Sequence, residues 1–257
     1  VLIDLPRDMQ LAEREFRLLP PAPPERPPAP SKEALQEAIR LLRECKKPIL
    51  CGGGGVRIAG AVDEFRALVE ATRIPTMQTL KGLGGIPYDH ELNLGMIGMH
   101  GFKQANLAVQ DCDLLICAGV RFDDRVTGAL PRFAPDAKVI HMDVDASEVG
   151  KLRKADAPLL GNLRESLRAL ATARPQIDAW REECLENKSG YAWNYDAPTD
   201  CVYVPAFLKQ LSEKAGAHTI VTTDVGQHQM WVSQHYRVRS PENLHTSGGM
   251  GTMGYGF

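Results

Sequence analysis

Three glycine-bearing loops contain the residues of this chain that are best suited to bind a nucleotide-containing cofactor. They are Gly52–Gly55, Leu94–Gly101 and Gly119–Gly128, and each adjoins a short apolar run. A glycine lets backbone N–H groups approach a ligand that a Cβ atom would hold away. The first loop follows a predicted strand and precedes a predicted helix, so its amides are expected to face a pyrophosphate, although it lacks the full GxGxxG spacing. Together the loops predict a cofactor-binding cradle.

Charged residues stand beside these loops. Asp143 ends a predicted strand, where a carboxylate suits ribose hydroxyls or the edge of an adenine; the alternative is a turn or helix N-cap residue. Arg121, Asp123 and Arg125 follow an apolar run, and their guanidinium groups could contact a flavin or a substrate carboxylate. The alternative is a solvated loop of surface ion pairs. His100 could stack on or donate to a flat ring, or have a structural role.

Two further loops near the C-terminus resemble a second, partial cofactor site. Asp224–His228 leaves a predicted strand and starts a predicted helix, as a diphosphate-binding terminus does. Met253 follows Gly251 and Thr252, and its side chain could support a heterocycle, with ordinary core packing as the alternative.

Apolar periodicity predicts alternating strands and helices. We expect strands at about 1–5, 48–51, 74–78, 113–118, 138–143 and 219–223, and helices at about 31–42, 62–71, 102–109, 163–172, 205–215 and 229–236. Strands of continuous apolar residues indicate a sheet buried on both faces. The order predicts an α/β fold: a doubly wound, mainly parallel, Rossmann-like open sheet, followed by the start of a second α/β domain. Residues 19–30 contain seven prolines and predict an extended linker, with an SH3-type ligand as the alternative.

Composition narrows the function classes. The chain has 257 residues, 44% hydrophobic and 24% charged, with a net charge of −2, so no nucleic-acid partner is expected. No apolar run approaches the ~20 residues that span a bilayer, and we expect a cytoplasmic protein. Six cysteines without a CxxC pair are expected to be free thiols, and no metal site is expected among them. Both ends are unlike natural termini, which predicts an internal fragment.

Several motifs together resemble one enzyme family, the catalytic large subunits of acetolactate synthase (acetohydroxyacid synthase), which depend on thiamine diphosphate. The resemblance runs over nearly the whole chain. Its segments are Val1–Asp8, Leu80–Gly84, Leu94–Gly101, Gly119–Gly128, His141–Asp145, Asp224–Met230 and Ser247–Gly256.

The resemblance implies a domain organisation. Residues 1–10 would be the tail of a pyrimidine-binding domain, and 11–30 a proline-rich linker. Residues 31–190 would form a central FAD-binding domain, 191–202 a connection, and 203–257 the truncated N-terminal part of a diphosphate-binding domain.

The resemblance also implies site residues. FAD would contact residues of the strand-following loops: Gly53, Thr79, Leu80, Ile97, Gly98, Met99, His100, Gly119, Val120, Arg121, Phe122, Asp123, Asp143, Val144, Asn162 and Leu163. Thiamine diphosphate would contact Val225, Gly226, Gln227, His228, Gly251, Thr252 and Met253. Arg7 and Arg125 would line the substrate channel, with Arg125 holding the acceptor carboxylate. Two positions depart from the family pattern: Lys81 stands where many members carry Met, and Asn162 where Asp is usual.

The implied chemistry is the decarboxylation of pyruvate on thiamine diphosphate and the joining of its two-carbon remainder to pyruvate or 2-oxobutyrate, in branched-chain amino acid synthesis. The glutamate that activates the cofactor and the Mg²⁺ ligands would lie outside this chain, so the fragment alone is predicted to be inactive. A homodimer or homotetramer with a small regulatory subunit is implied. The alternatives are another thiamine diphosphate enzyme, of glyoxylate carboligase or pyruvate oxidase type, and a non-catalytic FAD- or nucleotide-binding module.

Overall fold

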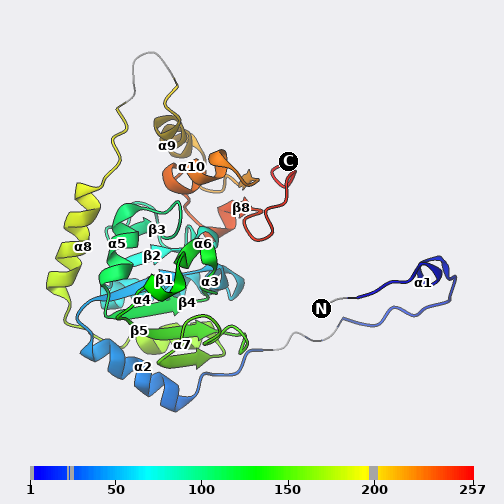
Figure 1. The fold of residues 1–257 in the computed structure, drawn as a ribbon, viewed down its shortest axis with the longest axis horizontal. Coiled ribbons are helices and arrows are strands. Elements are labelled where there is room, and N and C mark those ends of the chain that lie inside the picture. The colour runs from blue at the N-terminus through cyan, green and yellow to red at the C-terminus, as the bar shows by residue number, and fades with distance from the viewer. Residues whose placement is uncertain (1–2, 22, 24–25, 197–201) are drawn as a thin grey trace.

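The computed structural model describes residues 3–21, 23, 26–196 and 202–257. Most of them surround a six-stranded parallel sheet (Figure 1). Its strands are β1 (Pro48–Gly52), β2 (Thr76–Gln78), β3 (Asn93–Met96), β4 (Leu114–Ala118), β5 (Lys138–Asp143) and β6 (Ala157–Leu160). Their spatial order is β3-β2-β1-β4-β5-β6, so the chain reverses its direction across the sheet between β3 and β4. This order confirms the predicted doubly wound fold and creates a switch point between β1 and β4.

Helices cover both faces of this sheet. On one face, α2 (Lys32–Glu44), α4 (Val62–Thr72) and α7 (Leu163–Leu170) share a core with the strands. On the other face, α5 (Lys103–Asp111) and α8 (Asp178–Gly190) do the same. Alternate strand residues enter alternate cores, which explains why β1 and β4 are apolar and buried throughout.

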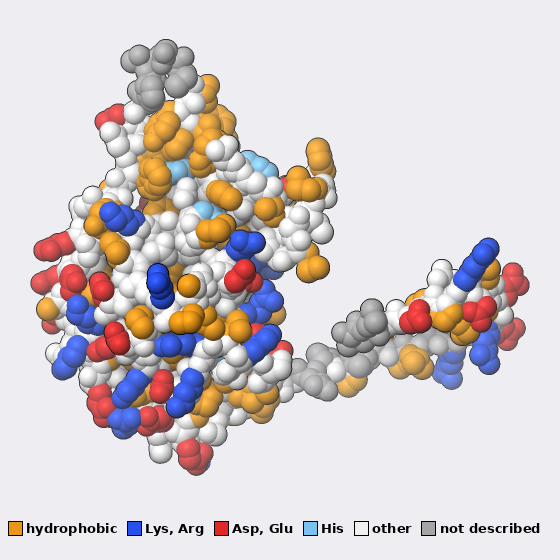
Figure 2. All heavy atoms as spheres, in the orientation of Figure 1, with side chains coloured by type: hydrophobic (Ala, Val, Ile, Leu, Met, Phe, Trp, Pro, Cys, Tyr) orange, Lys and Arg blue, Asp and Glu red, His pale blue; other side chains and the backbone are white. Residues whose placement is uncertain are grey.

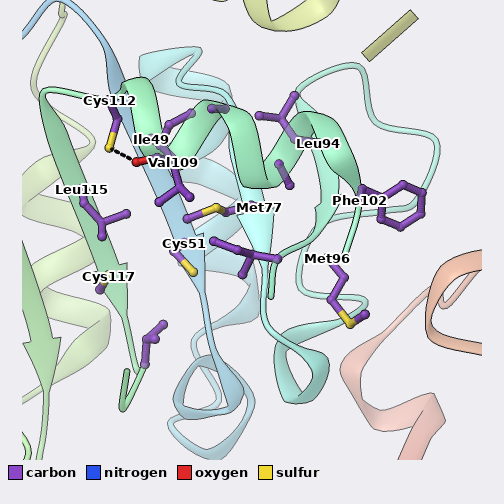
Figure 3. Close-up of a cluster of buried hydrophobic side chains, with 14 of the residues drawn as sticks. Ile49, Cys51, Met77, Leu94, Met96, Phe102, Val109, Cys112, Leu115 and Cys117 are labelled. Atoms are coloured by element: carbon purple, nitrogen blue, oxygen red, sulfur yellow. Dashed lines mark hydrogen bonds between the residues drawn. The ribbon is translucent and has the colours of Figure 1, made fainter. Parts of the chain in front are cut away.

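The second of these cores shows how the strands meet α5 (Figure 3). Ile49 of β1, Met77 of β2 and Leu115 of β4 contribute to one cluster. The Cys112 thiol at the end of α5 donates to the Val109 carbonyl, 3.1 Å away. The five described cysteines are free, as predicted, and Cys201 lies outside the described residues.

Side-chain caps begin four of the described helices, among them α2 and α7. Ser31 begins α2, because its hydroxyl accepts the Ala34 N–H at 3.1 Å. Shorter elements were not predicted: α3 (Gly54–Ile58), α6 (Asp124–Thr127), η1 (Leu80–Gly82), η2 (Leu130–Arg132) and η3 (Pro241–Asn243). The strands β3 and β6 were missed too. The former contains Gly95 and the latter Pro158, and both residues weaken a strand signal, although the edge of a sheet tolerates them.

The N-terminal prediction was wrong where it can be judged. Residues 1–2 lie outside the described part, and 3–5 are exposed and form no strand. A short helix, α1 (Arg7–Leu11), follows on an arm that extends away from the body (Figure 1). A strand forms only where a neighbouring strand hydrogen-bonds to its backbone N–H and C=O groups. The arm has no such neighbour in the described chain. The proline-rich stretch contains neither helix nor strand in its described residues, as predicted.

A smaller unit lies against the sheet. It contains α9 (Val204–Lys214), β7 (Val221–Thr223), α10 (Gln227–His235) and β8 (Leu244–Thr246), with β7 parallel to β8. Val232, Tyr236, Val238 and Leu244 are part of the same core cluster as α5. Figure 2 shows apolar side chains gathered over this smaller unit, while charged ones crowd the opposite end of the body. The two units therefore share one apolar core across their interface.

Substitution of Gly53 by Ala should destabilise the protein by about 3 kcal/mol, because the new Cβ would lie 2.1 Å from the Gly119 carbonyl oxygen and the backbones must separate. Urea unfolding of the Gly53→Ala variant measures this loss. The matched control is Gly190→Ala at the end of α8, where a Cβ meets nothing within 4 Å, and its stability should change by less than about 1 kcal/mol. Equal stability of the two variants would contradict the packing argument.

Candidate functional site

The residues implied for FAD gather at one edge of the large sheet. Gly53, Thr79, Ile97, Gly119 and Val144 each follow the carboxyl end of a different strand, from β1 to β5. In a parallel sheet these ends lie side by side. The structure thus brings together loops that are up to 91 residues apart in the sequence (53 to 144), and β6 adds Asn162 and Leu163 at the same edge.

The glycines at this edge have a different role from the one predicted for Gly53 and Gly55. The Gly53 N–H donates to the Ala118 carbonyl at 2.9 Å, and the Gly55 N–H donates to the Gly119 carbonyl at 3.1 Å. These two amides are therefore unavailable to a pyrophosphate, and the expectation that they face one was wrong. The missing side chains instead let the loop after β1 and the loop after β4 come into backbone contact.

The loops after β3 and β4 are joined at Arg125. The Met99 N–H donates to the Arg125 carbonyl at 2.8 Å, and the Arg125 guanidinium lies 3.9 Å from the Met99 sulfur. Both side chains are exposed. For Arg121 the structure shows the surface ion pair that was the alternative to a ligand contact. Its Nη2 lies 3.6 Å from the Asp123 carboxylate, and this exposed pair contributes under ~1 kcal/mol to stability. Asp123 also caps α6 by accepting the Arg125 N–H at 3.0 Å.

A buried aromatic pair supports the loop that carries Arg121. Phe122 has a φ of +54°, which is strained for a residue with a Cβ, and its ring meets the His141 ring edge-on at 5.0 Å. The His141 Nε2 lies 2.8 Å from the Val120 carbonyl, to which it donates when that nitrogen carries the proton. Burial lowers the pKa of His141, so the ring stays neutral. Sequence reasoning missed this supporting role because it depends on a contact between β5 and the loop after β4.

Asp143 and Asn162 make the local contacts of turn and cap residues. The Asp143 carboxylate accepts the Asp145 N–H at 3.0 Å, in a turn just after β5. The Asn162 side-chain oxygen accepts the N–H groups of Arg164 and Glu165 at 3.0 and 3.4 Å and caps α7. The turn alternative for Asp143 is therefore observed, and contact of either residue with FAD stays a prediction.

The residues implied for thiamine diphosphate also meet at one edge. Val225 precedes Gly226, which has a φ of +151° and stands at the N-cap of α10, so the amides of Gln227 and His228 open the helix. No side chain of the described residues caps this N-terminus, which leaves backbone donors for an anion. The loop after β8, with Gly251, Thr252 and Met253, lies at the same edge because β7 and β8 are parallel.

Asp224 holds these two loops together. Its carboxylate oxygens accept the N–H groups of Gly254 at 2.9 Å and Gly256 at 2.7 Å. These backbone hydrogen bonds keep the pKa of Asp224 below its ordinary value. The side chain of Met253 is 72% exposed, so it is not a core residue in the described structure.

Three buried hydroxyl groups near this edge have no hydrogen-bond partner among the described residues. They belong to Thr223 at the end of β7, and to Thr246 and Ser247 at the end of β8. Buried polar groups in native proteins are nearly always hydrogen-bonded. Unpartnered hydroxyls at the edge of the smaller sheet fit a polar ligand there. At the edge of the large sheet, the Nδ1 of the half-buried His100 ring is unpartnered among the described residues and fits a polar ligand in the same way.

Arg7 is not brought to either edge. It lies in α1 on the extended arm, and Figure 1 shows α1 far from α6, the helix that contains Arg125. The described residues contain no cluster of three or more His, Cys, Asp or Glu side chains that could hold a metal ion. Among the helices of the described ranges, none is both long and apolar enough to cross a membrane.

Protonation of Asp224 should release the C-terminal loop. Because its pKa is lowered in the folded protein, the two hydrogen bonds persist above the ordinary value of ~3.9 and are lost as the pH falls through the lower folded value. The amide proton shifts of Gly254 and Gly256 should titrate together with a midpoint below ~3.9. In Asp224→Asn this titration should disappear, while the Ser147 amide, which donates to Asp145, still titrates. A midpoint at or above ~3.9 would contradict the assignment.

Comparison with known proteins agrees with this geometry. The family model "Thiamine pyrophosphate enzyme, central domain" matches residues 35–170, which contain the large sheet, and "Thiamine pyrophosphate enzyme, C-terminal TPP binding domain" matches residues 224–257. The first matched range contains all six strands, and the second begins at Asp224.

Curated relatives match over the whole chain. The chain is 48% identical to the acetolactate synthase isozyme 2 large subunit of Escherichia coli over 257 residues, which is 46% of that protein. It is 40% identical to the probable acetolactate synthase large subunit of Methanocaldococcus jannaschii, again over 46% of that protein. It is 38% identical to the chloroplastic acetolactate synthase of Arabidopsis thaliana, over 40% of that protein. The chain thus spans less than half the length of these relatives. With its central-domain match over more than half of its residues, the chain belongs to the thiamine pyrophosphate enzyme family.

Proposed function

We propose that this chain is part of the catalytic large subunit of an acetolactate synthase, a transferase that joins pyruvate to a second 2-oxo acid. The observation that carries the proposal is the identity of 38–48% along the whole chain to large subunits of that name. The loops at both sheet edges support it, because they gather the residues that the family resemblance assigns to two cofactors.

Thiamine diphosphate would be held at the N-terminus of α10. The amides of Gln227 and His228 would bind the diphosphate, and the loop Gly251–Met253 would contact the rest of the cofactor. When bound, this cofactor supplies the electron sink for decarboxylating pyruvate. Asp224 would orient the C-terminal loop through its two backbone hydrogen bonds. The unpartnered hydroxyls of Thr223 and Ser247 are further candidates for polar contacts with it.

FAD would lie across the carboxyl edge of the large sheet. The Met99, Arg121 and Val144 side chains are exposed at this edge, and the buried His100 Nδ1 has no hydrogen-bond partner among the described residues. We propose that FAD holds the loops in place and takes no part in electron transfer. The residues 31–190 would then be the central domain and 203–257 the opening of the diphosphate-binding domain, with the connection at 191–202.

Arg125 would bind the carboxylate of the second 2-oxo acid. It is exposed beside Met99, and its carbonyl is fixed by the Met99 N–H at 2.8 Å. A planar guanidinium can bind a carboxylate with two parallel hydrogen bonds. Arg7 would reach the same channel only if the arm, with the tail 1–10 and the linker 11–30, adopts another position in the whole protein.

We further propose that the substrates are pyruvate and 2-oxobutyrate, in branched-chain amino acid synthesis. Mg²⁺ would be bound by residues outside the described ones. The protein would be a cytoplasmic homodimer or homotetramer that binds a small regulatory subunit. The names of the relatives support the reaction, and the finer assignments rest on the family resemblance alone.

The full-length enzyme, supplied with pyruvate, thiamine diphosphate, Mg²⁺ and FAD, should form acetolactate. Chromatography of the products decides between the proposal and its alternatives. Acetyl phosphate as the main product in phosphate buffer would replace the proposal by a pyruvate oxidase. Formation of tartronate semialdehyde in a parallel assay with glyoxylate, without acetolactate from pyruvate, would replace it by a glyoxylate carboligase. Binding of FAD without any turnover would leave a nucleotide-binding module.

Replacing Arg125 by Gln should weaken use of the second 2-oxo acid. Loss of one charged hydrogen bond of about 1.5–3 kcal/mol corresponds to a decrease of about 10- to 150-fold in kcat/KM for the acceptor. Steady-state kinetics with pyruvate as donor and 2-oxobutyrate as acceptor measure this change. Arg132→Gln, at an exposed arginine of η2, is the control and should leave kcat/KM unchanged. Equal kinetics for both variants would remove Arg125 from the acceptor site.

A further inference from the structure

We propose that the two cofactor sites are energetically coupled, so that FAD at the edge of the large sheet strengthens binding of thiamine diphosphate at α10. Two contacts would carry the coupling, one at His100 and one at Lys81, each between a loop of the large sheet and the smaller unit. The inference rests on the proposed function, because it requires both cofactors to bind where that function assigns them.

The first contact joins the loop after β3 to α10. The His100 carbonyl accepts a hydrogen bond from the Gln234 side-chain nitrogen at 2.6 Å, and the His100 Nε2 lies 3.4 Å from the Gln229 side-chain nitrogen. His100 directly follows Met99, which is exposed in the loop after β3 at the proposed FAD edge. Both glutamines belong to the nine-residue helix whose first amides would bind the diphosphate. A shift of the loop therefore moves the helix.

The second contact joins the loop after β2 to β8. The Lys81 ammonium donates to the Thr246 carbonyl, and burial lowers the pKa of Lys81. The neighbouring Leu80 side chain packs against Gly248, where a Cβ would lie 2.8 Å from its methyl carbon. Thr246 ends β8 and leads into the loop with Gly251 and Met253. Leu80 is one of the residues assigned to FAD, so this contact also links one cofactor site to the other.

The interface between these contacts is packed too closely for gradual sliding. Val232 of α10 and Tyr236 just after it share a buried cluster with Met96 and Phe102 of the large unit. At Gly84 the backbones meet so closely that a Cβ would lie 2.4 Å from the Ser240 carbonyl carbon. Close-packed interfaces of this kind change between discrete arrangements. Docking of the smaller unit on the large one is therefore the two-state element. Both cofactors would favour the docked state, and the coupling must be reciprocal.

Calorimetric titration of the cofactor-free, full-length enzyme tests the proposal. The Kd of thiamine diphosphate is measured with Mg²⁺, with and without saturating FAD. In the unmodified enzyme FAD should lower this Kd about tenfold, within the range typical of coupled sites. In Gln234→Ala, and independently in Lys81→Met, the factor should fall below about threefold, while the Kd of FAD measured alone stays within about threefold.

The matched control is Gln210→Ala on the exposed surface of α9, which should keep the full coupling factor. If the unmodified enzyme binds both cofactors but FAD does not change the Kd of thiamine diphosphate, the coupling is overturned. The proposed function then stays intact. Full coupling in both Gln234→Ala and Lys81→Met overturns the assigned contacts. Failure of the unmodified enzyme to bind either cofactor overturns the proposed function itself.

Discussion

The site depends on a row of backbone hydrogen bonds that continues the parallel ladder just beyond the strand ends. The Thr79 N–H donates to the Gly52 carbonyl, the Gly53 N–H to the Ala118 carbonyl, and the Gly119 N–H to the Met142 carbonyl, each at 2.9 Å. These bonds fix the first residue of each loop relative to its neighbour. Because they consume amides that would otherwise face solvent, they build a rigid edge on which side chains and later loop residues can be positioned.

Glycine is required at this edge by the neighbouring backbone. A Cβ on Gly82 would lie 2.2 Å from the Gly52 carbonyl oxygen, and one on Gly53 would lie 2.1 Å from that of Gly119. The three loops after β1, β2 and β4 therefore approach one another more closely than any residue with a side chain allows. The glycines correctly indicated a close approach, but a sequence does not say whether the approaching group is a ligand or another segment of the same chain.

The same distinction explains which predictions the sequence allowed. Strands such as 113–118 are continuous apolar runs, and a parallel sheet buried on both faces is the simplest structure that accounts for them. Ser31 was predictable as a cap because its contact with Ala34 is local. The partner of Asp224 was not, since Gly254 and Gly256 lie 30 and 32 residues away and donate through backbone groups that carry no residue-specific signal. The strand prediction at residues 3–5 was wrong for a related reason, since a strand depends on a partner outside the segment itself.

The smaller unit shows how far its order depends on the larger one. It contributes only two paired strands of its own, and a two-stranded sheet is marginally stable in water. Its buried Val232, Tyr236 and Leu244 belong to the core of the large sheet, and Arg66 of α4 donates to the carbonyls of both Gly84 and Arg239. The helix α10, which begins at Gln227, is thus held by the large unit as well as by its own strands, because Gln234 also donates to the His100 carbonyl. A ligand that stiffens the loops of the large sheet would consequently act on the geometry of that helix end. The interface, and not either proposed cofactor edge alone, would then set the spacing between the two proposed sites.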